Sequence, residues 1–344
     1  MRRLAGLLLA SLLLVTACGS HPGPSASGEP PSMEDPAPFP QEEEEVPPGD
    51  GAQDQDEEGD LLAYPFAVVV DNIAAARPQS GLEGAKVVVE ALTEGGITRY
   101  LAIFTRDPGT PIGPVRSARI YFNRLVHLWG LPMAHVGGNK DALEDWNRYP
   151  AYDIDDVRRG TSAFYRINER KAPHNTYTTA ERVEKVLEGR KIPPARLTFP
   201  SGEWAGDGEA VAGVELRYPQ GKSVYRVEWR YEEGRWHRYQ NGKADQSAAG
   251  VPLTANNVLI VVARVSPKED PWTPGSIDID FEHPTKAWLL RDGLAIPCRV
   301  EWTTTGFSLT ALSSDEEVLP LARGNLWIQW VKNEGDVVWQ PSSQ

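Results

Sequence analysis

The sequence has few of the residues that metal and redox sites usually require. Its 344 residues include two cysteines and six histidines, and no His/Cys cluster has the spacing of a metal site. No glycine-rich loop that would bind a nucleotide follows a predicted strand. We therefore expect no metal and no cofactor, and nucleotide binding and Ser-His-Asp hydrolysis are disfavoured.

Positive charge is absent from residues 19–60, which contain nine prolines and thirteen Asp or Glu. Such a segment cannot bury a core, and we expect a disordered, self-repelling tether. The whole chain has a net charge of −13, of which the tether contributes −13 and residues 1–18 contribute +2, leaving −2 for residues 61–344. This nearly neutral part gives no support for binding nucleic acid or for electrostatic adhesion to an anionic bilayer.

An apolar run at the N-terminus, Leu4 to Ala17, follows two arginines and ends in small residues. Its length and flanks predict a signal peptide over residues 1–18, too short to span a membrane stably. The ending Val15-Thr16-Ala17-Cys18 resembles the bacterial lipobox, which implies a lipid on Cys18 that anchors the chain to the membrane from the extracytoplasmic side. Ordinary secretion is the alternative. Cys298 is then the remaining thiol, predicted to be buried and inert on an alternating strand.

The rest of the chain divides by its hydrophobic pattern. Residues 61–200 mix buried strands with helices, one predicted from Pro114 and one capped by Thr178 or Thr179, and predict an α/β or α+β domain with a ligand cleft. A Pro- and Gly-rich stretch near residues 191–210 indicates a boundary. Residues 211–340 alternate through short strands and predict an all-β domain, a sandwich or barrel.

Tryptophans are frequent in this second half. They favour a core role over a carbohydrate platform, although one of Trp327 and Trp330 is expected to be exposed because their spacing places them on opposite strand faces. The residues concerned are Trp229, Trp236, Trp288, Trp302, Trp327, Trp330 and Trp339.

Charged residues interrupt an apolar hairpin around Gly95-Gly96. If these glycines form a two-residue turn, alternation places two carboxylates and an arginine on one otherwise apolar face, namely Glu90, Leu92, Glu94, Ile97, Arg99, Leu101 and Ile103. Charges on an apolar face must be paired or functional, because an unpaired buried charge is costly. Arg116 and Arg119 fall where a helix start would disfavour cations, so Glu90 and Glu94 are their candidate partners.

Two interpretations of these charges stay open. In one, the five residues form a closed ion-pair network that joins the hairpin to the helix. In the other, the three arginines exceed the two carboxylates, and the surplus charge binds a carboxylate or phosphate, or one Glu is held protonated as a general acid.

Histidines supply a second set of candidates. His174 and Asn175 follow a proline and precede a helix cap, a place where side chains often face a cleft. His135 stands beside two glycines that would let a ligand approach the backbone, although a structural role is favoured. His127 lies within the predicted helix and is expected on the surface or in packing.

Several phrases resemble the YerB-type bacterial lipoproteins: PFAVVVDN, ARPQSGL, VVVEALTEGGITRYLAIF, IGPVRSAR and PHNTYT, with NNVLIVVA and GNLWIQWV further on. The resemblance implies an N-terminal domain of unknown function, a β-rich C-terminal partner domain and a place on the outer face of a Gram-positive-type envelope. It implies no reaction. The residues that match its motifs are Asp71, Asn72, Arg77, Pro78, Ser80, Glu90, Glu94, Gly95, Gly96, Thr98, Arg99, Gly113, Pro114, Arg116, Ser117, Arg119, Pro173, His174 and Asn175.

The leading hypothesis is a lipid-anchored protein whose polar cleft binds an anionic or glycan envelope component such as peptidoglycan. The predicted ligand-binding residues are Arg99, Arg116, Ser117, Arg119, His174, Asn175, Arg77 and Asp71. One alternative is a glycan-cleaving hydrolase or lyase with Glu94 or Glu90 as general acid. Another is a scaffold for envelope proteins, which an exposed tryptophan patch would favour.

Overall fold

Strands dominate the part of the chain that the computed structural model describes, residues 61–312 and 317–342. These residues belong to one compact unit, Pro36–Gln344. The predicted signal peptide, lipidated Cys18 and tether lie outside the described residues. Among the described residues, no helix is both long and apolar enough to cross a membrane.

The N-terminal region mixes strands and helices. Its strands are β1 (Leu61–Asp71), β2 (Val87–Leu92), β3 (Thr98–Arg106), β4 (Met133–His135), β5 (Asp153–Asp155), β6 (Tyr165–Arg166) and β7 (Thr176–Tyr177). Its α-helices are α1 (Ile120–Leu128), α2 (Lys140–Asp145), α3 (Asp156–Arg159) and α4 (Ala180–Leu187), and its 3-10 turns are η1 (Ala74–Ala76), η2 (Leu82–Gly84), η3 (Glu94–Gly96) and η4 (Trp146–Arg148).

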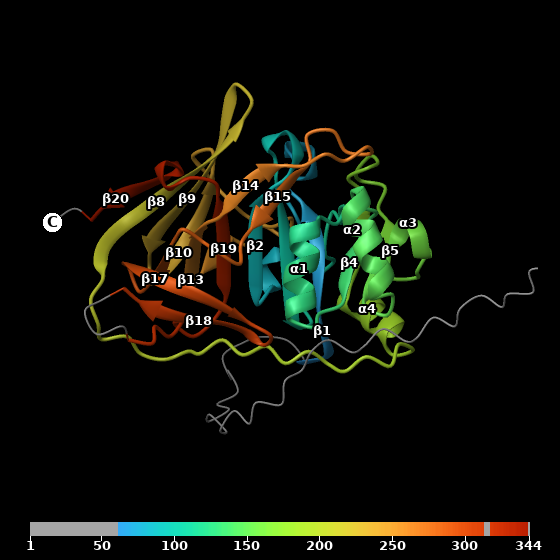
Figure 1. The fold of residues 1–344 in the computed structure, drawn as a ribbon, viewed down its shortest axis with the longest axis horizontal. Coiled ribbons are helices and arrows are strands. Elements are labelled where there is room, and N and C mark those ends of the chain that lie inside the picture. Colours follow the sequence, from blue (N-terminus) through green and yellow to red (C-terminus); the bar gives the residue numbers. More distant parts are fainter. Residues whose placement is uncertain (1–60, 313–316, 343–344) are drawn as a thin grey trace, which may run out of the picture. The chain divides into compact units, whose positions relative to one another are not determined.

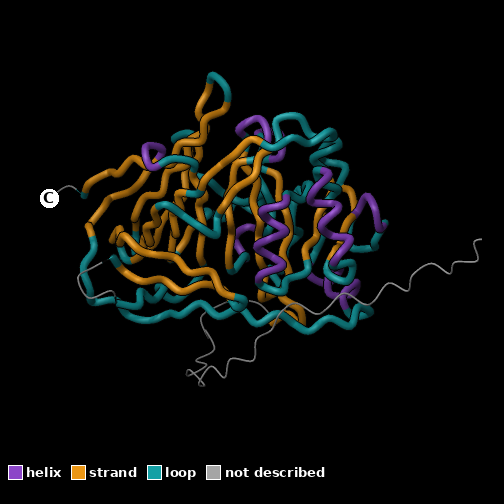
Figure 2. Tube along the Cα trace, viewed as in Figure 1, coloured by secondary structure: helices purple, strands orange, loops and turns teal. Residues whose placement is uncertain are grey.

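The C-terminal region is built from strands and one 3-10 turn, η5 (Glu334–Asp336). Its strands are β8 (Glu209–Gln220), β9 (Ser223–Glu232), β10 (Arg235–Gln240), β11 (Lys243–Ala244), β12 (Thr254–Ala255), β13 (Asn257–Val262), β14 (Arg264–Pro267), β15 (Ile277–Asp280), β16 (Lys286–Arg291), β17 (Leu294–Thr303), β18 (Gly306–Ala311), β19 (Leu326–Val331) and β20 (Val337–Pro341). Figure 2 shows the α-helices gathered around the N-terminal strands. The predicted fold class, a mixed α/β region followed by a strand-rich region, is confirmed.

One sheet runs through both regions in the order β11-β10-β9-β8-β17-β16-β13-β19-β2-β3-β1-β4-β5. The junction is β19, which pairs in parallel with β13 on one side and with β2 on the other. Strands β1, β4 and β5 are also parallel to one another. In Figure 1, β19 and β2 lie side by side in the middle of the sheet. The domain boundary expected near residues 200–211 stays a prediction, since the sheet crosses from one region to the other.

The sheet folds back so that β8 and β9 cover one face of β19. The rings of Trp229 on β9 and Trp327 on β19 are 5.3 Å apart, and the Tyr218 hydroxyl donates to Gln329 at 3.0 Å. On the opposite face, Trp330 stacks on Phe281 at 4.7 Å. Both β19 tryptophans are therefore buried, and the expectation that one would be exposed is wrong, because β19 is an internal strand covered on both faces.

Local sequence accounts for several elements. The β-branched run of β1 is buried on both faces from Phe66 onward, as an internal strand requires. Helix α4 begins after Thr179, whose side chain accepts a hydrogen bond from the Arg182 backbone N–H, and the predicted cap is thereby confirmed. Cys298 is also buried as predicted, and burial raises the pKa of its thiol to about 12.

The sequence predicts a helix that begins at Pro114, and this start is wrong. The corresponding helix, α1, begins at Ile120 with Arg119 as its N-cap. The preceding segment is extended and hydrogen-bonded on both sides. The backbone N–H of Val115 donates to Thr176 at 2.8 Å, and that of Arg116 donates to Val69 at 2.8 Å. These tertiary partners satisfy the backbone that a longer helix would have used, so Arg116 lies outside the helix.

The predicted hairpin register is wrong by one residue. The Thr93 backbone N–H donates to the Ile97 carbonyl at 2.7 Å, which closes a three-residue turn, Glu94–Gly96, instead of the two-residue turn assumed. Arg99 consequently pairs with Ala91, and Glu90 pairs with Tyr100. Because side chains alternate between faces, one extra turn residue moves Arg99 to the face opposite Glu90.

Candidate functional site

Asp71, the last residue of β1, contacts a histidine and an arginine side chain at the end of the sheet. Its Oδ2 atom lies 2.8 Å from Nδ1 of His174 and 3.0 Å from Nε of Arg116. The Asp71 side chain is buried, whereas His174 and Arg116 are 18% and 22% exposed. Arg116 reaches Asp71 because its segment is extended and not helical as predicted. The cluster (Asp71, Arg116, His174) thus brings together three of the predicted ligand-binding residues, which lie far apart in the sequence.

Glu94, in the hairpin turn, binds the other two predicted arginines. Its Oε1 atom is 2.9 Å from Nη2 of Arg99, and its Oε2 accepts from Nε of Arg119 at 2.8 Å. Burial opposes the ionisation of Glu94, but the charges of Arg99 and Arg119 outweigh it and lower its pKa from 4.5 to about 2. Glu94 therefore remains a carboxylate at neutral pH.

The two clusters are joined by the backbone of the segment between them. The Ser117 carbonyl accepts from Arg99 at 3.3 Å and from Arg119 at 3.5 Å, directly beside Arg116 in the chain. Burial, followed by the positive charge of Arg119, lowers the pKa of Arg99 to about 10, so Arg99 stays protonated at pH 7. The described site thus has three guanidinium groups and two carboxylates, Asp71 and Glu94.

Glu90 does not join this site, contrary to its predicted pairing with Arg116 or Arg119. Its Oε2 atom is 2.7 Å from Nη2 of Arg238, and neither side chain is exposed. Its Oε1 accepts from Thr98 at 2.7 Å and from Asn72 at 3.2 Å. Sequence reasoning missed Arg238. Trp236, Arg238 and Gln240 point inward from β10, and the alternation that puts Arg238 on the same strand face as Trp236 is a sequence signal that could have indicated its burial.

Arg77 and Asn175 have separate positions. Arg77 donates through Nε to Oδ1 of Asn72 at 2.9 Å, and its guanidinium lies over the Tyr225 ring at 4.9 Å. Arg77 therefore connects Asn72, the residue after Asp71, to Tyr225 in the C-terminal region. Asn175 follows His174 in the chain, but its side chain binds Arg166 at 2.9 Å and the Ile167 carbonyl at 3.2 Å. The structure does not bring the Asn175 amide to Asp71.

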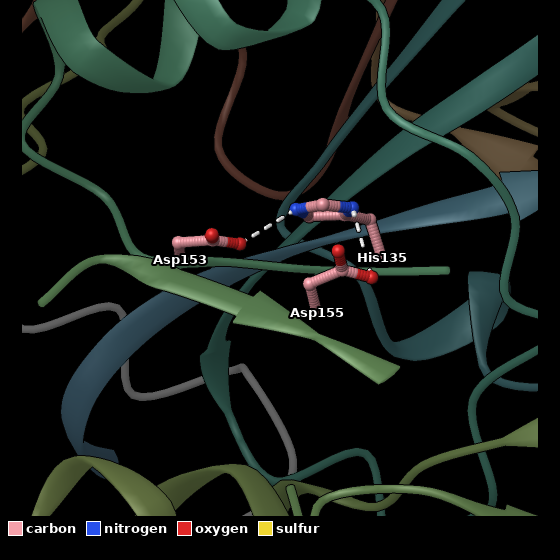
Figure 3. Close-up of side chains that lie close together, drawn as sticks. All are labelled: His135, Asp153 and Asp155. Atoms are coloured by element: carbon pink, nitrogen blue, oxygen red, sulfur yellow. Dashed lines mark hydrogen bonds and ion pairs between the residues drawn. The ribbon is translucent and has the colours of Figure 1, made fainter. Parts of the chain in front are cut away.

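His135 forms a different cluster with Asp153 and Asp155, shown in Figure 3. Its Nε2 atom lies 2.9 Å from Asp153 and its Nδ1 lies 2.8 Å from the Gly137 carbonyl. Both ring nitrogens are therefore engaged by oxygen atoms of the protein.

The two carboxylates of this cluster are also occupied. Asp153 accepts from Arg158 and Arg159 at 2.8 and 2.7 Å, and Asp155 caps α3. All three residues of the cluster are fully buried. The donor set therefore fits a structural brace between β4 and β5 rather than a metal centre. The remaining predicted histidine, His127, is packed against Trp146 at 4.6 Å, and burial lowers its pKa to about 3.

This arrangement defines a class of protein in which an N-terminal α/β region, bearing a polar cluster at one end of its sheet, shares that sheet with a strand-rich C-terminal region. Two family models match the chain in the same order. They describe the N-terminal domain of a protein of unknown function (DUF3048), over residues 51–193, and the C-terminal domain of the same family, over residues 214–328. The chain belongs to the DUF3048 family.

Two comparisons with individual proteins agree. The chain is 31% identical over 273 residues to "Putative lipoprotein YerB" of Bacillus subtilis (strain 168). The aligned region covers 78% of this chain and 81% of that protein. A crystal structure of the YerB protein from Bacillus subtilis matches with a TM-score of 0.70 and 30% identity, covering 80% of this chain and 93% of that chain. The resemblance to YerB-type lipoproteins is confirmed.

Proposed function

We propose that the chain is a lipid-anchored envelope protein that binds an anionic wall component at the cluster of Asp71, Arg116 and His174. The signal-peptide pattern ending in Cys18 and the name of the Bacillus relative support an anchor in the membrane and an extracytoplasmic place. A tether of acidic residues would hold the folded part away from an anionic surface. Peptidoglycan, with its carboxylates and sugars, is within reach of such a tether.

The observation that carries this proposal is the charge balance. Arg99, Arg116 and Arg119 face only two carboxylates within the described site, and Arg116 is partly exposed. A guanidinium group binds carboxylate or phosphate through a planar pair of donors. Because Arg99 and Arg119 are buried against Glu94, the accessible guanidinium group is that of Arg116, which contacts Asp71 through Nε and is 22% exposed.

The structure gives less support to a glycan-cleaving enzyme that uses Glu94 or Glu90. A general acid must carry a proton at working pH, and the pKa of Glu94 is lowered to about 2. Glu90 is fully buried against Arg238 and has no access to a glycan. A scaffold role also has less support, because the seven tryptophans weighed as a platform are absent from the exposed large apolar residues of the described chain, which include one tryptophan, Trp272.

The test is sedimentation of the full chain, purified in detergent, with cell-wall sacculi. Arg116→Ala should abolish binding with little loss of stability, because Arg116 is partly exposed. Arg119→Ala is a poorer test, since the Arg119 side chain is buried and its removal leaves Glu94 with Arg99 alone. Arg323→Ala is the matched control, an exposed arginine just before β19, at the end of the β2–β19 pair away from Glu94. Equal sedimentation of the wild type, Arg116→Ala and Arg323→Ala would contradict the proposal.

A further inference from the structure

His174 lies on the wall of a pocket of about 520 Å³, whose other lining residues are Ala75, Glu169, Arg170 and Lys171. Its Nδ1 atom faces the buried Asp71 at 2.8 Å. Within the described residues, its Nε2 atom has no hydrogen-bond partner. An imidazole oriented by a carboxylate through one nitrogen, with the other nitrogen free at a pocket, is the arrangement that proton transfer to or from a ligand requires.

Three other histidine–aspartate pairs among the described residues provide a comparison. His127 lies 3.3 Å from the buried Asp145 and lines neither described pocket. His135 meets Asp153 at 2.9 Å, but neither side chain is exposed, so no ligand reaches it. His283 meets Asp280 at 3.0 Å on an exposed turn, where its side chain is 81% exposed and lines neither described pocket. Of these pairs in the described part of the chain, the one at Asp71 combines a buried carboxylate with a histidine on the wall of a described pocket.

The pocket also carries positive charge. Arg170 is fixed there, because its guanidinium donates to the carbonyls of Ala75 at 3.1 Å and Pro78 at 2.6 Å. Lys171 is exposed next to it, and Glu169 is the acidic residue on the wall. Arg116 contacts the same Oδ2 atom of Asp71 that His174 contacts. An anion held in this pocket would therefore meet cations beside the free nitrogen of His174.

We propose that His174 is a general base, positioned by Asp71, that hydrolyses a phosphodiester in the bound anion. This inference rests on the proposed function. His174 Nε2 takes a proton from a water molecule, whose oxygen forms a bond to phosphorus while the bond from phosphorus to one ester oxygen breaks. The departing alkoxide then takes the proton from His174. One water is consumed, and the diester becomes a monoester and an alcohol.

A phosphodiester fits this site better than an ester that merely carries a carboxylate elsewhere. In a phosphodiester the negative charge lies on the reacting group itself, and it increases in the transition state of water attack. Cations next to the base therefore contact the atoms whose charge grows, which is the condition for electrostatic catalysis. In a carboxylate-bearing ester, the cations would bind a charge that does not change during the reaction.

The experiment uses the full chain in detergent with the phosphodiester of two glycerol molecules as the probe. Phosphorus NMR follows conversion of diester to monoester, and calorimetry measures binding of the same probe. His174→Asn keeps a donor for Asp71 but removes the second ring nitrogen, and it should lower the rate of cleavage of the bound probe at least about 100-fold, a larger factor than any change in the dissociation constant. His283→Asn is the matched control and should leave both values unchanged.

Asp71 acts through His174, so its variant needs a separate readout. Asp71→Asn keeps an oxygen acceptor for Nδ1 but removes the charge that stabilises the protonated ring, and it should lower kcat by a larger factor than it raises KM. A rise in KM alone would show that Asp71 only holds Arg116, which would overturn its positioning role.

Three results would overturn the inference as a whole. If the probe binds the wild type but is not cleaved, the inference of phosphodiester hydrolysis is overturned and the proposed binding function is not. A probe that fails to bind, together with intact sedimentation with sacculi, would show that the substrate class is wrong. Cleavage at the wild-type rate by His174→Asn would show that His174 is not the base.

Discussion

Arg238 on β10 and Glu90 on β2 meet at 2.7 Å with both side chains fully buried, although 148 residues separate them in the sequence. The pair joins the C-terminal region to the strand that precedes the Glu94 turn. Arg238 also lies over the Trp327 ring at 5.0 Å and donates to the Tyr225 hydroxyl at 3.0 Å. Through Tyr225 and Asn72, which are 3.0 Å apart, this network reaches the residue next to Asp71.

Removing one partner of this pair should destabilise the fold strongly. Arg238→Met leaves Glu90 as an unpaired buried carboxylate, and we expect the free energy of unfolding to fall by about 3 to 5 kcal/mol. The double variant with Glu90→Gln should recover part of that loss, because Glu90 is then neutral and Asp245, the other carboxylate that Arg238 binds, is the charge left without its arginine. Urea denaturation measures all three proteins.

An exposed ion pair provides the control for this prediction. Arg226 lies 3.8 Å from Glu215 and is 49% exposed, and Arg226→Met should cost no more than about 1 kcal/mol. If Arg238→Met and Arg226→Met destabilise the protein equally, the buried pair does not join the two regions as described.

Stability should decrease in acid through Glu94. Its pKa in the folded state, about 2, lies below its ordinary value of 4.5, so its stabilising contribution is complete above pH 4.5 and is lost as the pH falls toward 2. The contribution is at most about 3 kcal/mol. Glu94→Gln should therefore lose stability at pH 7 and show a flatter pH dependence between 4.5 and 2, measured by urea denaturation at each pH. The exposed Glu209→Gln should keep the wild-type profile.

The two turn glycines should differ in their tolerance of a side chain. Both have positive φ, 71° for Gly95 and 74° for Gly96, so alanine is strained at either position, by about 1 to 2 kcal/mol. A Cβ at Gly95 meets nothing within 4 Å, whereas a Cβ at Gly96 would overlap the Pro219 carbonyl. Gly96→Ala should therefore lower the melting temperature clearly more than Gly95→Ala. Equal losses would show that the β8–β9 hairpin does not pack on this turn.

How far the sequence predicts the structure depends on the range of the interactions involved. The buried run of β1 and the Thr179 cap of α4 depend on neighbours in the sequence, and both are predicted correctly. The start of α1 depends on hydrogen bonds from Val115 and Arg116 to Thr176 and Val69, which no local pattern contains. Gly-Pro followed by an apolar repeat indicates a helix that begins at Pro114 as well as it indicates one that begins at Ile120.

The candidate site shows the same division. Arg119 and Glu94 are paired as predicted, but a single extra residue in the turn moves Arg99 to the other face of β3. Arg99 still reaches Glu94, because Glu94 lies in the turn and not on either face. Arg238 belongs to a partner strand far along the chain, so its pairing with Glu90 requires knowledge of the β10–β2 contact, which the sequence alone does not give.

The central claim is that a partly exposed positive charge at Arg116 recognises an anionic wall component. The most direct measurement is the fraction of full chain that sediments with sacculi as the salt concentration is raised, for the wild type and for Arg116→Ala. We predict that wild-type binding weakens steadily as salt screens the charges, and that Arg116→Ala binds weakly at every salt concentration while Arg323→Ala behaves as the wild type. Wild-type binding that is insensitive to salt and unchanged in Arg116→Ala would contradict the claim.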